Sequence, residues 1–406
     1  MQRGHLSDHF TGVAVKRLSE VETNPAASNQ HEFNGSAELR SLFGEDDRRN
    51  IPTRFLWIGQ EQEAVSVDGY ISWYDARRRH PSRTEYRLYY PSNEITEIMQ
   101  AGDSLLMAVC RDATALVVVT PSDSTMHNQL LWLFGIDTQS DLQFNYQQVT
   151  GNRDAELDFA ARCILEALGL DPSEPEASRL DTLIDPFGMV FPKTRVFSEL
   201  ARSSLPHISA HEDPDLAIIE WMDREEQLFR RLERRIVGER IASGFQNAAG
   251  ADVDGFIKFS LSVQNTRKSR AGLALENHLE AIFDACSIQF NRGAESENGN
   301  KPDFLFPGQA EYREPSFPAS QLTMLGAKSS LKDRWRQVLS EAVRIPEKHL
   351  LTLEPSISRN RTDEMQTKGL QLVVPQGLHQ TFQPEQQSWL MNVGSFIELL
   401  RTRQSA

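Results

Sequence analysis

Hydrophobic residues in the first part of the chain fall into short runs separated by polar and turn-forming residues. Short strands at such spacing are typical of a compact barrel or sandwich. We therefore predict a β-rich N-terminal region, followed by an amphipathic helix over residues 153–169 that ends at Gly169. The strands are expected at residues 54–59, 86–90, 104–109, 115–120 and 129–135.

The second half of the chain alternates between helical and extended patterns. Apolar residues three and four positions apart predict helices at residues 215–242, 271–286, 331–345 and 386–403. Short apolar runs predict strands at residues 302–306, 321–328, 348–355 and 370–375. Because the later strands are apolar on both faces, we expect a buried mixed sheet flanked by helices.

A proline-containing acidic segment separates the two halves. Residues 171–188 contain three prolines and carry a net charge of −4, which is typical of a linker. We therefore divide the 406 residues into an N-terminal domain (1–170), a linker (171–190) and a C-terminal domain (191–406).

Composition narrows the class of protein. No run approaches the roughly 20 apolar residues of a membrane span, and Met1–Ser19 lacks the apolar core of a secretory signal. The cysteines Cys110, Cys163 and Cys286 are odd in number and far apart, which excludes a CxxC zinc site and a disulfide framework. We expect a cytoplasmic protein.

The net charge of −14 argues against a surface that binds nucleic acids throughout. Positive charge is nevertheless concentrated in residues 77–90 (+4), 264–270 (+3) and 328–336 (+3). Such runs fit either local anion-binding sites or ordinary solvated faces. The candidates for DNA contacts in the two later runs include Arg267, Lys268, Arg270 and Arg336.

A Pro-Asp pair, a lysine and a carboxylate occupy successive elements of the second half. Asp303 begins one strand, Lys328 ends the next, and Glu341 lies on the following predicted helix. Carboxylates of this kind hold Mg²⁺, and a lysine beside them stabilises charge on a phosphate. Glu276, on the polar side of its predicted helix, is a further candidate, or else part of a solvated face. The set fits phosphodiester hydrolysis, but a Pro-Asp pair followed by a lysine also occurs by chance, so this pattern alone leaves a purely structural role open.

The segment Lys332-Asp333-Arg334 begins the helix predicted over residues 331–345. Arginine binds guanine O6 and N7, and aspartate accepts a hydrogen bond from cytosine N4, so the segment suits C·G pairs. Arg334 and Glu341 are seven residues apart, which places them on nearly the same helix face, about 10 Å apart. An exposed helix start explains the same residues, and the sequence pattern leaves both interpretations open.

Several of these stretches together resemble the EcoRII-type restriction endonucleases, a type II (IIE) group. The matching stretches are NTRKSRAGLALENHLEAIF (265–283), KPDFLFP (301–307), LGAKSSLKDRWRQVLSEA (325–342) and LQLVVP (370–375). The resemblance implies a C-terminal PD-(D/E)XK nuclease domain that acts as a homodimer on double-stranded DNA. It implies Mg²⁺-dependent cuts that leave 5′-phosphates at CC…GG-core sites such as CCWGG or CCNGG, with a cognate methyltransferase in the same cell.

The resemblance also implies roles for individual residues. Asp303 and Glu341 match the metal ligands, while Glu276 and Lys328 complete the catalytic set. Gly326 departs from the simplest pattern of this fold, in which an acidic residue lies two positions before the lysine. The bases are read by residues that match Lys332, Asp333 and Arg334. Tyr312 matches a tyrosine that has been discussed as catalytic. We expect Tyr312 to be structural, because a metal-activated water needs no tyrosine nucleophile.

In the first half, VKRLS (15–19) and RTEYR (83–87) are similar to parts of the family's N-terminal domain. That domain is a B3-like pseudobarrel that binds a second recognition site and restrains cleavage. Residues that alternate along a strand share one face, so Arg83, Glu85 and Arg87 fit a DNA-contacting ladder. They also fit an edge strand protected by charge.

We thus predict a restriction endonuclease with a regulatory DNA-binding domain. Two alternatives remain open: a non-catalytic DNA-binding regulator, and a nuclease of different specificity, such as a methylation-dependent one.

Overall fold

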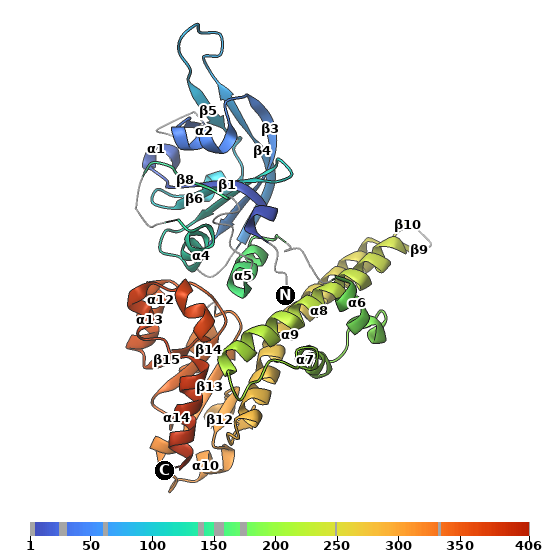
Figure 1. Cartoon of the computed structure of the whole chain (residues 1–406), viewed down its shortest axis with the longest axis vertical. Helices are drawn as coiled ribbons and strands as arrows, with labels where there is room; N and C mark the ends of the chain where they lie inside the picture. Colours follow the sequence, from blue (N-terminus) through green and yellow to red (C-terminus); the bar gives the residue numbers. More distant parts are fainter. Residues whose placement is uncertain are drawn as a thin grey trace. The chain divides into compact units, whose positions relative to one another are not determined.

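The computed structural model describes residues 5–23, 31–59, 64–136, 142–149, 158–170, 177–247, 250–331 and 334–405. The chain divides into two compact units (Figure 1). The first comprises Arg3–Ser173 together with Pro355–Asn360, and the second comprises Glu174–Glu354 together with Arg361–Ala406.

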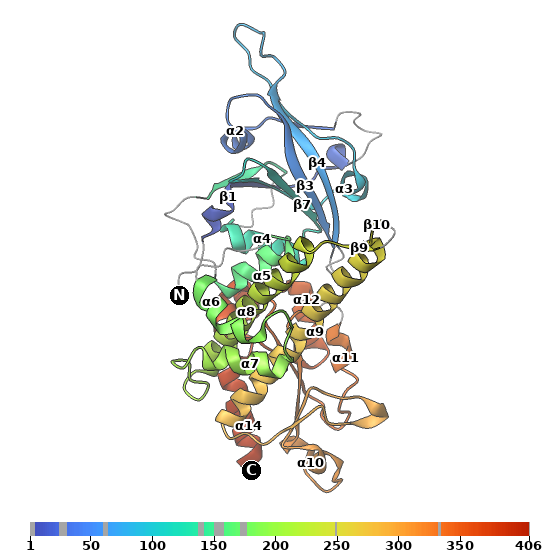
Figure 2. The ribbon, with the colours of Figure 1, turned by 90° about the vertical axis from the view of Figure 1, so that its right-hand side faces the viewer.

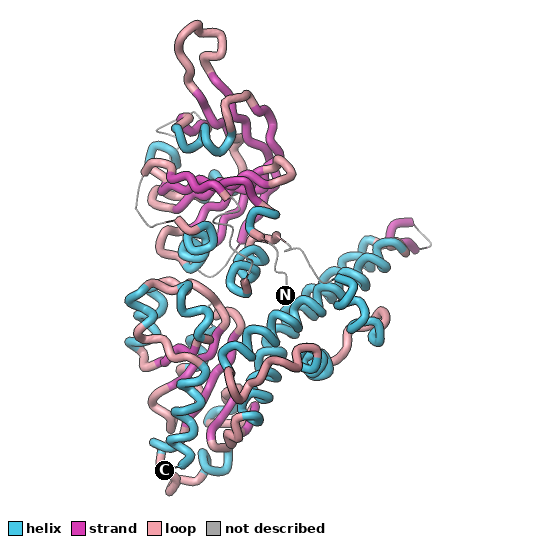
Figure 3. Tube along the Cα trace, viewed as in Figure 1, coloured by secondary structure: helices cyan, strands magenta, loops and turns pink. Residues whose placement is uncertain are grey.

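The first unit is built on an eight-stranded sheet, drawn in magenta in Figure 3, with the strand order β2-β5-β4-β3-β7-β6-β1-β8. All neighbouring strands are antiparallel except β3 and β7, which are parallel. The strands are β1 (Phe10–Arg17), β2 (Glu32–Asn34), β3 (Arg48–Ile58), β4 (Ala64–Asp75), β5 (Tyr86–Tyr89), β6 (Ser104–Cys110), β7 (Ala115–Thr120) and β8 (Asn145–Gln148). The β-rich character predicted for this region is confirmed.

The central strands of this sheet bury both faces, because hydrophobic cores lie on either side. Leu105 and Met107 of β6 pack into one core, and the alternating Leu106 and Ala108 into the other. Helices α2 and α3 contribute to the first core, and α4 and α5 to the second. The helical segments of this unit are η1 (Leu6–Asp8), α1 (Glu20–Thr23), α2 (Ala37–Phe43), α3 (Glu94–Ile98), α4 (Thr125–Phe134) and α5 (Phe159–Ala167).

Residues 129–135, predicted as a strand, instead form the end of helix α4 and its C-cap, Gly135. The hydroxyl of Ser124 accepts a hydrogen bond from the backbone N of His127 (3.0 Å), which caps the helix, and Gly135 ends it at a φ of 62°. Most of the helix is buried, so the sequence lacks the polar side that marks an amphipathic helix. The strand prediction was therefore wrong.

The second unit begins with helices that pack side by side (Figure 2). They are α6 (Ala177–Ile184), α7 (Thr194–Ser203), α8 (Pro214–Ala242) and α9 (Val253–Ala285), with η2 (Asp185–Phe187) after α6 and the short strands β9 (Gln246–Asn247) and β10 (Gly250–Ala251) between α8 and α9. No helix in the described ranges is both long and apolar enough to span a membrane.

The segment expected to be a linker contributes to this helical core. Leu180 and Ile184 of α6 are buried against Leu228 and Leu232 of α8. Asp181 of α6 also lies 2.6 Å from Arg231 of α8. From residue 177 onward the segment is therefore folded against the C-terminal unit.

A five-stranded sheet follows, with the order β11-β12-β13-β14-β15. The first three strands are antiparallel and the last three parallel, so the predicted mixed sheet is confirmed. The strands are β11 (Asn291–Arg292), β12 (Phe304–Phe306), β13 (Thr323–Lys328), β14 (Lys348–Thr352) and β15 (Leu370–Val373). The remaining helical segments are η3 (Glu297–Gly299), α10 (Gln309–Arg313), η4 (Ala319–Gln321), α11 (Trp335–Val338), α12 (Arg359–Thr367), η6 (Gln376–Thr381), α13 (Pro384–Gln387) and α14 (Val393–Ser405). The ring of Phe283 on α9 contacts Phe304 on β12 and Phe396 on α14, which joins helices and sheet in one core.

The helix predicted over residues 331–345 is wrong, because among the described residues of this range α-helix covers only α11. After α11 the chain turns, and Ala342 adopts a φ of 48°. Pro346 follows Ile345, and a proline disfavours helix at the preceding residue. Trp335, Ala342 and Ile345 are nevertheless buried. The apolar spacing therefore predicted correctly which residues are buried, although the predicted helix does not extend over them.

Candidate active site

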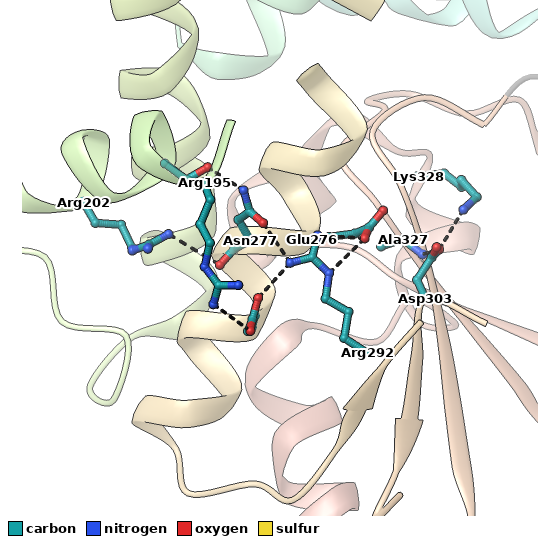
Figure 4. Close-up of polar contacts among 10 residues, drawn as sticks. Arg195, Arg202, Glu276, Asn277, Arg292, Asp303, Ala327 and Lys328 are labelled. Atoms are coloured by element: carbon teal, nitrogen blue, oxygen red, sulfur yellow. Dashed lines mark hydrogen bonds and ion pairs between the residues drawn. The ribbon is translucent and has the colours of Figure 1, made fainter. Parts of the chain in front are cut away.

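Asp303 and Lys328 meet where two antiparallel strands lie side by side. Asp303 directly precedes β12 and Lys328 ends β13, and Phe304 pairs with Leu325 in the sheet. One oxygen of Asp303, Oδ2, accepts hydrogen bonds from Lys328 Nζ (2.7 Å) and from the backbone N of Ala327 (2.7 Å) (Figure 4). Rigid strands therefore fix both groups.

Gly326 explains why no acidic residue lies two positions before the lysine. A Cβ atom at this position would lie 2.9 Å from Val338 Cγ2 and 3.3 Å from Leu350 Cδ1. The glycine thus allows α11 to approach the sheet closely, and a larger side chain there would collide with the core.

Glu341 lies in the turn after α11 and is half-buried. Burial raises its pKa to about 7, the negative charge of Asp303 adds to the rise, and Lys328 and Lys348 oppose it. Glu341 is therefore close enough to Asp303 and Lys328 for their charges to act on it. No described residue donates a hydrogen bond to its carboxylate.

Glu276 of α9 completes the acidic group. Figure 4 places its carboxylate between Arg292 and Asp303. Burial raises the pKa of Glu276, and the charge of Asp303 raises it further, while Arg292 lowers it. The tertiary structure thus brings Glu276, Asp303, Lys328 and Glu341 to one region, although they come from different elements.

The carboxylates of this region can be compared with the ligands that a divalent cation requires. Among the described residues, no three His, Cys, Asp or Glu side chains form a ready metal cage. Mg²⁺ does not require one, because it is usually held by one or two carboxylates, waters and phosphate oxygens. Asp303 Oδ1, Glu276 Oε1 and the Glu341 carboxylate accept no hydrogen bond from described residues, so they remain open oxygen ligands. The residues fit Mg²⁺, with Asp303 and Glu341 as the pair that would hold it.

The segment expected to read bases is described only in part. Lys332 and Asp333 lie outside the described residues. Arg334 is exposed and donates a hydrogen bond to the carbonyl oxygen of Ser330 (3.2 Å). Arg336 is half-exposed and pairs with Glu364 at 2.9 Å. Because the helix ends at Val338, Arg334 and Glu341 do not share a helix face as predicted.

The basic run on α9 is largely engaged with the neighbouring helix α8. Arg267 pairs with Glu233. Arg270 is buried, pairs with Glu225 and Glu226, and lies over the ring of Phe229. The expectation that Arg270 contacts DNA does not fit this position, since its guanidinium is used between helices. Lys268, by contrast, is exposed and makes no ion pair with a described residue.

In the N-terminal unit, the expected ladder lies on and before β5. Glu85 and Arg87 point to the outer side, while the alternating Tyr86 and Leu88 are buried. Glu85 pairs with both Arg87 and Arg77, and the hydrogen bond from Arg87 lowers the pKa of Glu85. Arg83 is exposed and precedes the strand. The three residues remain candidates for DNA contacts.

Tyr312 occupies a structural setting. It is buried, and its hydroxyl donates to the carboxylate of Glu297 (2.6 Å) and accepts from the backbone N of Arg344 (3.3 Å). Burial raises the pKa of Tyr312, and the carboxylate of Glu297 raises it further, so the phenol keeps its proton. This setting supports the structural role that we expected.

Sequence reasoning missed Arg292 and Lys348. Arg292 binds Glu276, and Lys348 Nζ donates to the carbonyl oxygens of Ala342 (3.0 Å) and Ile345 (2.7 Å) in the turn after Glu341. The position of Lys348 at the start of an apolar strand could have indicated its role, because a buried lysine needs hydrogen-bond acceptors nearby. No local motif marks Arg292.

Comparison with known proteins shows what this part of the chain is similar to. Residues 229–397 match the family described as "EcoRII C terminal". The chain is 39% identical over 202 residues to the type II restriction enzyme EcoRII of Escherichia coli, and the match covers 49% of each chain. The chain thus spans about half the length of the curated relative it matches.

Two solved structures are more distantly similar. Metal-depleted Ecl18kI in complex with uncleaved DNA covers 56% of this chain and 84% of its own, at 18% identity and a TM-score of 0.42. The PspGI–substrate DNA complex covers 53% and 94%, at 14% identity and a TM-score of 0.44.

Proposed function

Because residues 229–397 belong to the EcoRII C-terminal family, we propose that this chain is a type II restriction endonuclease. It makes Mg²⁺-dependent double-strand cuts at a site with a CC…GG core. Its C-terminal unit is a PD-(D/E)XK nuclease domain and its N-terminal unit a B3-like pseudobarrel.

The observation that carries this proposal is the convergence of Asp303, Lys328 and Glu341 beside one edge of the mixed sheet. Asp303 holds the lysine at 2.7 Å, and its charge acts on Glu341. Placing two carboxylates close together in a partly buried region is unfavourable, because like charges repel and lose solvation. A protein that only binds DNA has no need for such a pair beside a lysine that is held by one of them.

Each residue then has a distinct task in the reaction. When bound, Mg²⁺ polarises a phosphoryl oxygen and lowers the pKa of the attacking water. Asp303 and Glu341 supply its open carboxylate oxygens. Lys328, oriented by Asp303, places its positive charge beside the phosphate, where negative charge grows in the transition state. Cleavage before the first C of the site leaves a 5′-phosphate and a 3′-hydroxyl.

DNA binding requires both units in this proposal. Arg334, with Lys332 and Asp333, reads bases, and Lys268 and Arg336 contact phosphates. Arg83, Glu85 and Arg87 bind a second copy of the site, and the N-terminal unit restrains cleavage until then. A homodimer provides two active sites for the two strands of a two-fold symmetric site.

The test is cleavage of a sequenced plasmid that carries CC…GG-core sites, with and without Mg²⁺ and with added site-containing oligonucleotides. Mapped cuts within these sites are expected only with Mg²⁺. Footprints without cleavage, unchanged by Asp303→Ala, would identify a non-catalytic regulator instead. Cleavage of methylated plasmid alone would identify a nuclease of different specificity.

A further inference from the structure

Arg292, on the edge strand β11, makes a hydrogen-bonded fork with three residues of α9 (Figure 4). Its Nε and Nη2 atoms both donate to a single oxygen of Glu276, Oε2, at 3.1 and 2.9 Å. Its Nη1 atom donates to Asn277 Oδ1 (2.8 Å) and Glu280 Oε2 (2.7 Å). The fork therefore holds one oxygen of Glu276 and leaves the other without a described donor.

Asp303 divides its two oxygens in the same way. Lys328 and the backbone of Ala327 bind Oδ2, and Oδ1 accepts no hydrogen bond from a described residue. Glu276 and Asp303 thus each have one oxygen fixed by protein donors and one that is open. An oriented carboxylate with an open oxygen is what a cation site needs, because the ligand is ordered before the ion arrives.

The partners of Arg292 are themselves fixed by α7. Arg195 donates to Glu280 Oε1 at 3.1 Å, and Ser198 accepts from Asn277 Nδ2 at 3.0 Å. Arg292 is partly buried, so it has limited freedom to leave this fork. An arginine is required for the arrangement, because a lysine presents its donors from one atom and cannot span three acceptors.

We propose that Arg292 is a positioning residue, which holds Glu276 Oε2 so that Oε1 is presented to a divalent cation beside Asp303. This inference rests on the proposed nuclease function. Arg292 acts through Glu276 and needs no contact with DNA. Loss of such supporting contacts around a metal ligand typically lowers metal affinity by about 10–100-fold.

The experiment compares Arg292→Lys with wild-type full-length protein, using Mn²⁺ as a probe whose free concentration is measured by electron paramagnetic resonance. Arg401→Lys is the matched control, because Arg401 forms an exposed ion pair with Glu398. We expect R292K to bind Mn²⁺ about 10-fold more weakly and R401K to bind it as wild type does.

Repeating Arg292→Lys in a Glu276→Gln background distinguishes positioning through Glu276 from a merely structural role of Arg292. There R292K is expected to alter Mn²⁺ affinity less than twofold, because its effect passes through Glu276. Glu280→Gln, which removes one anchor of Arg292, keeps the test informative if R292K does not fold; it is expected to weaken binding about threefold. The inference is overturned if R292K loses the same Mn²⁺ affinity in the wild-type and the E276Q background. It is also overturned if R292K and E280Q both bind Mn²⁺ as tightly as R401K does.

Cleavage by the wild type separates this inference from the proposed function. If the wild type does not cut but Mn²⁺ binding depends on Arg292 through Glu276, the nuclease assignment fails and the positioning role stands. If the wild type cuts and Mn²⁺ affinity does not depend on Arg292, only the positioning role fails.

Discussion

Lys328 and Asp303 form a direct ion pair, with Nζ 2.7 Å from Oδ2, although 25 positions separate them in the chain. The pair places a positive charge beside the open oxygen of Asp303. We predict that Lys328→Ala abolishes cleavage and keeps specific DNA binding, since Arg334 and its neighbours are unchanged. Cleavage and mobility-shift assays check this, with Lys301→Ala, an exposed lysine paired with Glu295, as control. Loss of binding together with cleavage would show that Lys328 is structural.

The raised pKa of Glu341 has a consequence for stability in metal-free buffer. The ordinary pKa is 4.5 and the folded value about 7, so the folded state binds the proton more tightly than the unfolded chain does. The carboxyl therefore lowers stability as pH rises from about 4.5 to 7, and this penalty persists above 7. Partial exposure reduces it to on the order of 1 kcal/mol.

Glu341→Gln removes this penalty. We expect E341Q to unfold about 2–4 °C higher than wild type at pH 8 in EDTA and at the same temperature at pH 4, while losing cleavage. Thermal unfolding followed by circular dichroism measures this. Glu385→Gln, at an exposed position, is the control. An unchanged midpoint at pH 8 contradicts the prediction.

Lys348 holds the turn that follows Glu341. Lys348→Met leaves the carbonyl oxygens of Ala342 and Ile345 without their donor, which costs about 1–3 kcal/mol. We expect a single-turnover cleavage rate at least tenfold lower, because Glu341 loses its fixed place. The exposed Lys368, paired with Glu364, offers a control in Lys368→Met. Equal rates for the two variants would rule out a role for Lys348 in the site.

Helix α6 changes how a C-terminal fragment should be chosen. A fragment that begins at residue 191 lacks Leu180 and Ile184, whose buried side chains pack on α8. We expect a fragment beginning at residue 175 to cleave single-site DNA faster than the full chain, as release from N-terminal restraint requires. The shorter fragment should unfold at a lower temperature, because burying side chains of this size is worth about 2–5 kcal/mol each. Equal cleavage by full chain and longer fragment would exclude restraint.

The basic run on α9 separates into two kinds of residue. Arg270 is buried between helices, so Arg270→Met should lower the unfolding temperature by several degrees. Lys268 is exposed, so Lys268→Met should leave stability unchanged and reduce the salt dependence of DNA binding by about one phosphate contact. Unfolding curves and binding at several salt concentrations distinguish them. If K268M weakens DNA binding no more than the same substitution at an unrelated exposed lysine does, a phosphate contact by Lys268 is contradicted.

Much of the site was predictable because two of its residues lie at the ends of strands with strong local signals. The apolar runs around Asp303 and Lys328 identify two buried strands, and the carboxylate–lysine set on them indicates metal-dependent chemistry. The wrong secondary-structure predictions concern segments that are buried on several sides, where the alternation of polar and apolar residues no longer indicates the type of element. Helix α4 was predicted as a strand because most of it is buried, and the turn after α11 was predicted as helix because Ala342 and Ile345 are buried at helical spacing.

The sequence by itself determined the class of the two halves, the mixed sheet, and the identity of Glu276, Asp303, Lys328 and Glu341 as candidates. It did so because strand periodicity and residue chemistry are local properties. Only the tertiary structure decided which charges face each other: Arg270 against the acids of α8, and Arg292 against Glu276. Such pairs join residues on separate elements, and no local pattern records which element will lie beside another.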